Sequence, residues 1–190
     1  MNDKFQTNFK VTQLYDKNKL VPQVTKIGIL PFIADKPFRI MVMKPRTEAK
    51  HLGPPAFQIA KGTRRININE NWCDMREEDL RYADESFYET LIQTALREGE
   101  EEVGLKASNI KQLFDMGSFT FVSASRGIVK PLHMFAAEII HADDFASYEA
   151  TTSEVRWMTM PEFKPIGRPD HTSIVEEILA RLESAFFAGI

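Results

Sequence analysis

The chain has 190 residues, of which 43% are hydrophobic and 27% charged, and its formal net charge is −3. These values are ordinary for a soluble globular protein, and we expect residues 1–190 to form a single domain. A weakly acidic chain lacks the basic stripe of a general nucleic-acid-binding protein, although free nucleotides and other small phosphates remain compatible. No stretch approaches the roughly 18 apolar residues of a membrane span, and residues 1–20 show no apolar leader. With a single cysteine, Cys73, the sequence favours a reducing cytoplasm.

The first half of the chain predicts an extension, two strands and a charged segment. Residues 1–22 read as a polar N-terminal extension. Apolar and β-branched runs predict strands over 24–32 and 38–43, joined by a turn at 35–37. Most of the segment 74–84 is charged, and it precedes the first predicted helix.

That helix begins somewhere in 85–90, because Thr90-Leu91-Ile92-Gln93 and Ser86-Phe87-Tyr88-Glu89 are equally good capping-box patterns. Gly104 supplies its C-terminal stop. The stripe that can pack against a core consists of Ile92, Ala95, Leu96, Gly99 and Val103.

The second half predicts a hairpin, a last strand and a helix. Strands are expected over 110–122 and 128–140, separated by a loop at 123–127, and a further strand over 153–158. Apolar residues at helical spacing predict a helix over 172–187. The expected fold class is therefore α/β, with a mixed sheet between helices.

Glutamates crowd the C-terminal turn of the first helix. Like charges three and four residues apart repel by roughly 0.2–0.5 kcal/mol each, and the negative end of the helix dipole adds to that cost. Glu98, Glu101 and Glu102 fall at i, i+3 and i+4, so they share one face of the helix, opposite the apolar stripe. A glutamate run by itself is usually just a solvated face. Three carboxylates on the side of a helix that faces a cleft instead make an oxygen site for a hard cation such as Mg²⁺.

These residues resemble the signature of the Nudix hydrolases, Gly-x5-Glu-x7-Arg-Glu-U-x-Glu-Glu-x-Gly-U, in which U is apolar. Glu89 stands eight positions before Arg97-Glu98, and Glu101-Glu102, Gly104 and Leu105 follow in register. The resemblance implies an α/β/α sandwich.

The chain departs from this signature twice. The first U is Gly99, which costs a helix interior about 1 kcal/mol relative to alanine and suggests either close backbone packing or a weakened site. The nearest match to the opening glycine is Gly62, in Phe57-Gln58-Ile59-Ala60-Lys61-Gly62. The spacing from Gly62 to Glu89 exceeds that of the family, so we expect an insertion at about 63–83 within the loop of the signature.

The resemblance also implies roles for individual residues. Glu98, Glu101 and Glu102, with the backbone of Gly62 or its neighbour Lys61, would bind Mg²⁺, with Mn²⁺ as the alternative ion. Glu98 or a glutamate on a later loop would accept a proton from the attacking water, and Glu89 and Arg97 would form a supporting ion pair. The residues that remain open as the additional acid are Glu149, Glu154 and Glu162.

The insertion offers further candidates beside the cation. Arg64 and Arg65 could bind a polyphosphate through their forked guanidinium groups, or could instead pair with acidic residues of the insertion. Trp72 could stack on a base or anchor the insertion to the core. Lys61, beside the opening glycine, is a further candidate for substrate binding.

The sequence therefore predicts a metal-dependent hydrolase that splits a diphosphate linkage in a nucleoside diphosphate derivative. The expected partner is a small phosphorylated substrate rather than a membrane, and a homodimer stays open. Two alternatives exist: a catalytically silent module that binds a nucleotide, and a prenyl diphosphate isomerase, for which Cys73 is poorly placed.

Overall fold

The computed structural model describes residues 9–16, 24–47, 56–82, 84–122, 129–145, 148–149 and 151–187. Its helices and strands are, in chain order, β1 (Lys10–Gln13), β2 (Lys26–Ile33), β3 (Arg39–Pro45), β4 (Ala60–Thr63), β5 (Arg65–Ile68), β6 (Asn71–Asp74), α1 (Asp79–Tyr82), the 3-10 helix η2 (Glu85–Phe87), α2 (Leu91–Val103), the 3-10 helix η3 (Ala107–Asn109), β7 (Ile110–Val122), β8 (Val129–Ile139), β9 (Thr152–Thr159), α3 (Met160–Phe163) and α4 (Pro169–Phe187). The predicted strands and both predicted helices are present. The predicted loop at 123–127 lies outside the described residues.

A seven-stranded mixed sheet runs through the middle of the molecule. Six of its strands follow the order β1-β7-β8-β2-β3-β9, and the seventh, β4, pairs with β2. Strand β8 is parallel to β2 and β1 is parallel to β7, whereas the other pairs are antiparallel. Strands β3 and β4 pair with different halves of β2. The expected mixed sheet is therefore confirmed, and it gains a strand, β1, from within the predicted N-terminal extension.

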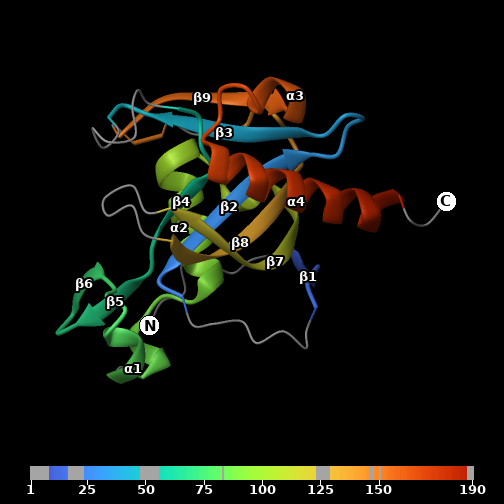
Figure 1. Ribbon diagram of the computed structural model, residues 1–190. Helices are drawn as coiled ribbons and strands as arrows, with labels where there is room; N and C mark the ends of the chain where they lie inside the picture. Colours follow the sequence, from blue (N-terminus) through green and yellow to red (C-terminus); the bar gives the residue numbers. More distant parts are fainter. Residues whose placement is uncertain are drawn as a thin grey trace.

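The sheet is covered by α2 on one face and by α4 on the other (Figure 1). Successive side chains of a strand point to opposite faces, so Ile29 of β2 packs with α2 while Leu30 packs with α4. The core on the α4 face includes Phe32 and Ile178, both fully buried. This arrangement is the predicted sandwich of helices around a mixed sheet.

Helix α2 begins and ends where local chemistry directs. The Thr90 side chain accepts from the backbone N–H of Gln93, and the Gln93 side chain accepts from that of Thr90, which completes a capping box. Of the two predicted starts, the structure has the one at Thr90, and the earlier pattern lies at η2. Gly104 takes a left-handed conformation, with φ 72° and ψ 22°, and ends the helix.

The predicted insertion forms a small unit beside the body of the molecule. Strands β5 and β6 make a two-stranded sheet separate from the main one, and α1 follows it. Ile66, Met75 and Tyr88 form a small apolar cluster of their own, with Leu80 packed against it. In Figure 1 the hairpin and α1 project to one side, away from the C-terminal end of α4.

Candidate active site

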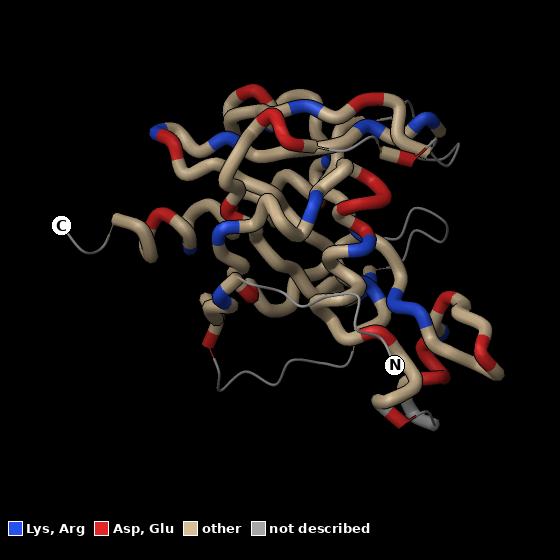
Figure 2. Tube along the Cα trace, turned by 180° about the vertical axis from the view of Figure 1, so that it is seen from behind, with Lys and Arg blue, Asp and Glu red and all other residues tan. Residues whose placement is uncertain are grey.

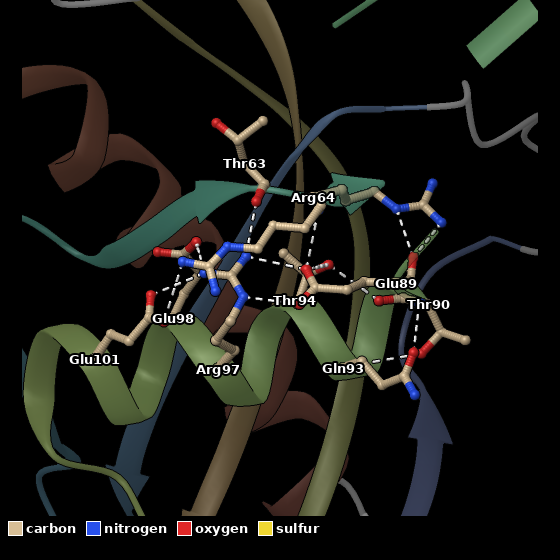
Figure 3. Close-up of polar contacts among 10 residues, drawn as sticks. Thr63, Arg64, Glu89, Thr90, Gln93, Thr94, Arg97, Glu98 and Glu101 are labelled. Atoms are coloured by element: carbon tan, nitrogen blue, oxygen red, sulfur yellow. Dashed lines mark hydrogen bonds and ion pairs between the residues drawn. The ribbon is translucent and has the colours of Figure 1, made fainter. Parts of the chain in front are cut away.

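Two carboxylates on α2, Glu98 and Glu101, lie around one arginine of the same helix, Arg97 (Figure 3). Arg97 Nη1 donates to Glu98 Oε1 at 2.5 Å and to Glu101 Oε2 at 2.8 Å. Two carboxylates thus converge on a single guanidinium nitrogen. Glu98 is 7% exposed, so this is a partly desolvated network rather than a solvated helix face.

The same arginine ties α2 to the residues that precede it. Its Nε donates to Glu89 Oε1 at 2.8 Å, and its Nη2 donates to Glu89 Oε2 at 3.0 Å and to the carbonyl of Thr63 at 2.7 Å. Glu89 and Arg97 therefore form a bidentate ion pair. Burial disfavours the charge on Arg97, but its bonds to Glu89 and Glu98 prevail and raise its pKa.

Strand β4 brings the expected opening glycine against these carboxylates. A Cβ at position 62 would lie 2.0 Å from the carboxylate atoms of Glu98, so any larger residue would displace that carboxylate from its present position. The backbone N–H of Lys61 donates to Glu102 Oε2 at 2.7 Å. Gly62 and the three glutamates, far apart in the sequence, therefore form one site.

Burial shapes the protonation of two of the glutamates. It raises the pKa of Glu98, with Glu101 adding to the effect and Arg97 opposing it. It raises the pKa of Glu102 to about 7, although Lys61 partly offsets the increase. Because a metal ligand must be ionised, a cation that bound here would have to displace the proton that burial favours on Glu102.

Basic side chains flank the carboxylates. Arg65 Nη2 lies 3.3 Å from Glu101 Oε1, at the exposed edge of the cluster. Lys26, at the start of β2, hydrogen-bonds to Thr63, and burial lowers its pKa while Asp74 and Glu98 oppose that effect. No local pattern in the sequence marks Lys26, because only the pairing of β2 with β4 brings it here. Figure 2 shows acidic and basic positions close together on the side of the body that carries the insertion.

The remaining candidates for substrate binding lie in different surroundings. Lys61 Nζ donates to Gln58 Oε1 at 3.2 Å and lies 5.8 Å from the ring centroid of Phe121. Arg64 is 8% exposed, and its Nε and Nη2 donate to the carbonyl of Glu89 at 3.0 and 2.6 Å. These contacts give Arg64 a structural role that neither interpretation of the sequence anticipated. Trp72, on β6, is 43% exposed, so it does not anchor the insertion to the core.

The three candidates for the additional acid, Glu149, Glu154 and Glu162, lie in different parts of the structure. The backbone N–H of Glu149 donates to the carbonyl of Glu101 at 2.8 Å, which places Glu149 beside α2. Glu154 pairs with Arg156 on β9. Glu162 completes a capping box with Thr159 at the start of α3. Glu149 is therefore the acid whose backbone contacts the cluster.

The chemistry of these ligands fits a hard divalent cation, because three carboxylates and the backbone of β4 offer only oxygen atoms. Among the described residues, however, no three acidic, histidine or cysteine side chains are arranged to hold a metal ion. The hydrogen bonds explain this: Arg97 holds Glu98 and Glu101, while the Lys61 amide holds Glu102. Binding a cation would require the carboxylates to turn away from these donors.

A recess of about 550 Å³ lies on the α4 face, between β7, β8 and the N-terminal half of α4. Phe119 and Phe121 line it, together with the acidic residues Asp170 and Glu177. Both acids are paired, the first with Arg168 and the second with Arg181. Because Lys61 lies against Phe121 and bonds to Glu102 through its backbone, β4 links the recess to the carboxylates.

A family model described as NUDIX domain matches residues 86–181. No curated protein sequence matches the chain. Among the part of the chain that the structure describes, no helix has the length and apolar character needed to cross a membrane.

Several solved structures share the fold. The NUDIX domain of Shewanella oneidensis NrtR, complexed with ADP ribose, matches with 15% identity and a TM-score of 0.57, over 88% of this chain and 94% of its own. The Ap4A hydrolase of C. elegans, in a binary complex, matches with 16% identity and a TM-score of 0.56, over 88% and 100%. A putative NUDIX hydrolase from Listeria monocytogenes matches with 18% identity and a TM-score of 0.56, over 86% and 97%. At these identities the likeness shows the shared architecture.

Proposed function

The chain belongs to the Nudix hydrolase family, and we propose that it cleaves a diphosphate linkage in a nucleoside diphosphate derivative, with water as the attacking group. The observation that carries this proposal is the gathering of three carboxylates at β4: Glu98 and Glu101 on Arg97, with Glu98 against Gly62, and Glu102 on the Lys61 amide. Like charges at the end of a helix are costly, and an isolated structural role would be better served by apolar residues. The similar NUDIX domain with ADP ribose and the similar Ap4A hydrolase support a nucleotide-derived substrate.

The chemistry of the reaction sets the tasks of the site. Two linked phosphates repel a nucleophile, so their charge must be neutralised and the attacking water must lose a proton. A divalent cation of the magnesium class, held by Glu98, Glu101, Glu102 and the Gly62 carbonyl, would supply both effects, with Mn²⁺ as the alternative. Arg65 and Lys26 flank these carboxylates and would bind phosphate oxygens.

Proton removal falls to a carboxylate of the cluster. Glu98 is the first candidate, because its buried carboxylate lies against Gly62 and water bound to a cation is acidic enough for a carboxylate to accept its proton. Glu149 is the second, since its backbone contacts Glu101. Glu89 touches none of the reacting atoms in this proposal. It orients Arg97, which in turn orients Glu98 and Glu101.

The recess on the α4 face would receive one of the two groups joined by the diphosphate. Its acids are neutralised by arginines, so it suits an uncharged group rather than a further phosphate. Lys61 lies between this recess and Glu102, in position to contact the phosphate nearest the recess.

The alternative is a catalytically silent module that binds a nucleotide. The departure at Gly99 and the insertion in the signature motivate it. In the structure, however, Gly99 is explained by packing, since a Cβ there would lie 3.0 Å from Ile29 Cγ2 and from Leu105 Cδ2. The geometry of the cluster therefore favours the enzyme.

The deciding experiment incubates the protein with a panel of nucleoside diphosphate derivatives in ¹⁸O-labelled water, with Mg²⁺ or with a chelator. We expect phosphate products that carry ¹⁸O only when Mg²⁺ is present. Nucleoside monophosphate esters, which lack the anhydride, serve as matched controls and should remain intact. If nucleotides bind but no anhydride is cleaved with Mg²⁺ or Mn²⁺, the silent module is correct.

A further inference from the structure

The hairpin of the insertion has two chemically different faces. The pairing of β5 with β6 sets Arg65 opposite Asp74 and Asn67 opposite Trp72, with Ile66 opposite Cys73 between them. Because successive side chains alternate across a strand, Arg65, Asn67 and Trp72 share one face. We call this the polar face of the hairpin. Ile66 and Ile68 lie on the other face.

The base of the hairpin is fixed to the segment that leads into α2. Arg64 donates to the carbonyl of Glu89, and its guanidinium lies 4.7 Å from the ring centroid of Tyr88. The backbone N–H of Glu89 donates in turn to the carbonyl of Arg65 at 2.9 Å. Ile66 and Tyr88 are buried in the cluster beneath. These contacts hold the hairpin in a set position relative to the carboxylates.

The polar face continues the candidate active site. Arg65 reaches Glu101 with Nη2, and the pair Asn67–Trp72 is the next pair outward on the same face. The indole of Trp72 is 43% exposed, although burying an aromatic ring is strongly favourable. An exposed ring beside a phosphate-binding arginine is the arrangement that binds a planar group attached to phosphate.

We propose that the polar face of the hairpin is a recognition site for a planar aromatic group of the nucleobase class, carried by the phosphate chain of the substrate. Trp72 stacks on the ring, Asn67 bonds to its polar edge, and Arg65 binds the phosphate between the ring and the cleaved bond. This site is on the α2 side of β4, whereas the recess is on the α4 side, so the two receive groups on opposite sides of the diphosphate. The proposal rests on the proposed function.

The hairpin itself offers a matched control. Ile68 is 48% exposed, close to the exposure of Trp72, but it lies on the opposite face. Trp72→Ala should raise KM for a nucleoside diphosphate derivative about tenfold with little change in kcat. Ile68→Ala should change neither, and Trp72→Phe should restore most of the affinity because it keeps a ring. For an analogue that lacks the base, Trp72→Ala and the parent should have the same KM. If Trp72→Ala and the parent had the same KM for the base-containing substrate, the recognition site would be excluded. That result would leave the proposed hydrolysis standing.

A binding measurement tests the proposal without catalysis. The chain has two tryptophans, so in Trp157→Phe the emission excited at the red edge, where tyrosine does not absorb, comes from Trp72 alone. Titration with ADP and Mg²⁺ should quench this emission, and ribose 5-phosphate with Mg²⁺ should not. Unchanged emission at ADP concentrations that saturate the protein by calorimetry would rule out stacking. This result stands whether or not the protein hydrolyses any substrate, so the two proposals can fail separately.

Discussion

The two helices that cover the sheet differ in what lies beside their buried apolar side chains. Helix α4 buries Ile174, Val175, Ile178, Leu179 and Leu182, which join an aromatic cluster of the strands. Helix α2 also buries an apolar stripe, but beside it lie the charges of Glu98 and Arg97. Desolvating such charges costs free energy that their pairing only partly returns. We infer that the α4 face supplies stability and that the α2 face gives up part of its own for chemistry.

The largest expected effect is a loss of stability, without a loss of activity, from a substitution on the α4 face. Ile178 is fully buried there and lies outside the lining of the recess. Ile178→Ala should lower the free energy of unfolding by about 3.5 kcal/mol, through lost burial and the cavity left behind. Activity per folded molecule should not change. Urea unfolding and turnover at a temperature where the variant is folded check this, with Ser184→Ala on the exposed side of α4 as the control. A large drop in turnover of the folded variant would mean that the two faces are not independent.

The next largest effect is expected on the α2 face, where a substitution should lower activity without lowering stability. Glu102→Gln keeps the shape and the acceptor for the Lys61 amide but removes the charge. Activity should fall at least 100-fold, about 2.7 kcal/mol in the barrier, because a charge that stabilises the transition state is lost. Without metal, the thermal midpoint should stay the same or rise, since repulsion within the glutamate run is relieved. Glu100→Gln, on the exposed side of the same helix, is the control. Near-parental turnover by Glu102→Gln would exclude the proposed mechanism.

The smallest effect is a pH dependence at the start of α4. His171 is fully buried, and its Nδ1 accepts from the backbone N–H of Ile59 at 3.1 Å. Burial, with the charges of Lys61 and Arg168, holds the pKa of His171 well below its usual value. The unfolded chain protonates this imidazole below about pH 6.5. The folded protein resists protonation, so its stability is complete above that pH and is lost as the pH falls.

Urea unfolding at pH 7.5 and 5.5, with a chelator, measures this contribution. His171→Asn keeps an acceptor for Ile59 but cannot titrate, so the parent should lose about 1 kcal/mol more than this variant between the two pH values. Glu98 and Glu102 titrate in both proteins, and their effects cancel in the difference. Equal losses in the two proteins would show that His171 can be protonated in the folded state.

Local signals in the sequence were enough to predict α2 and its cluster. The capping box at Thr90, the stop at Gly104 and the spacing of the glutamates all act within a few residues. The position of Gly62 could be predicted only through a resemblance, and the structure brings it against Glu98. What sequence could not decide depends on strand pairing. Neighbouring arginines face opposite ways at the start of β5, so Arg64 is buried beside Tyr88 while Arg65 reaches Glu101.

Strand pairing also explains why β1 and Lys26 were not predicted from the sequence. Strand β1 is short and polar, and only its parallel pairing with β7 identifies it as part of the sheet. Lys26 joins the site because β2 and β4 pair in a register that sets it opposite Thr63. Contacts between segments far apart in sequence leave no periodic pattern in either segment.

Helix α2 approaches β2 closely at Gly99, so the side-chain volumes at positions 29 and 99, far apart in sequence, are coupled. A methyl group at position 99 would meet Ile29 at 3.0 Å, tighter than most contacts of a real Cβ. Gly99→Ala should therefore strain the packing, and it should cost less stability in a background where Ile29→Ala has already removed that Cγ2 methyl. Since α2 carries the carboxylates, a side chain too large for this contact would push Glu98 away from Gly62. Homologues with a residue larger than glycine at position 99 should carry a residue smaller than isoleucine at position 29.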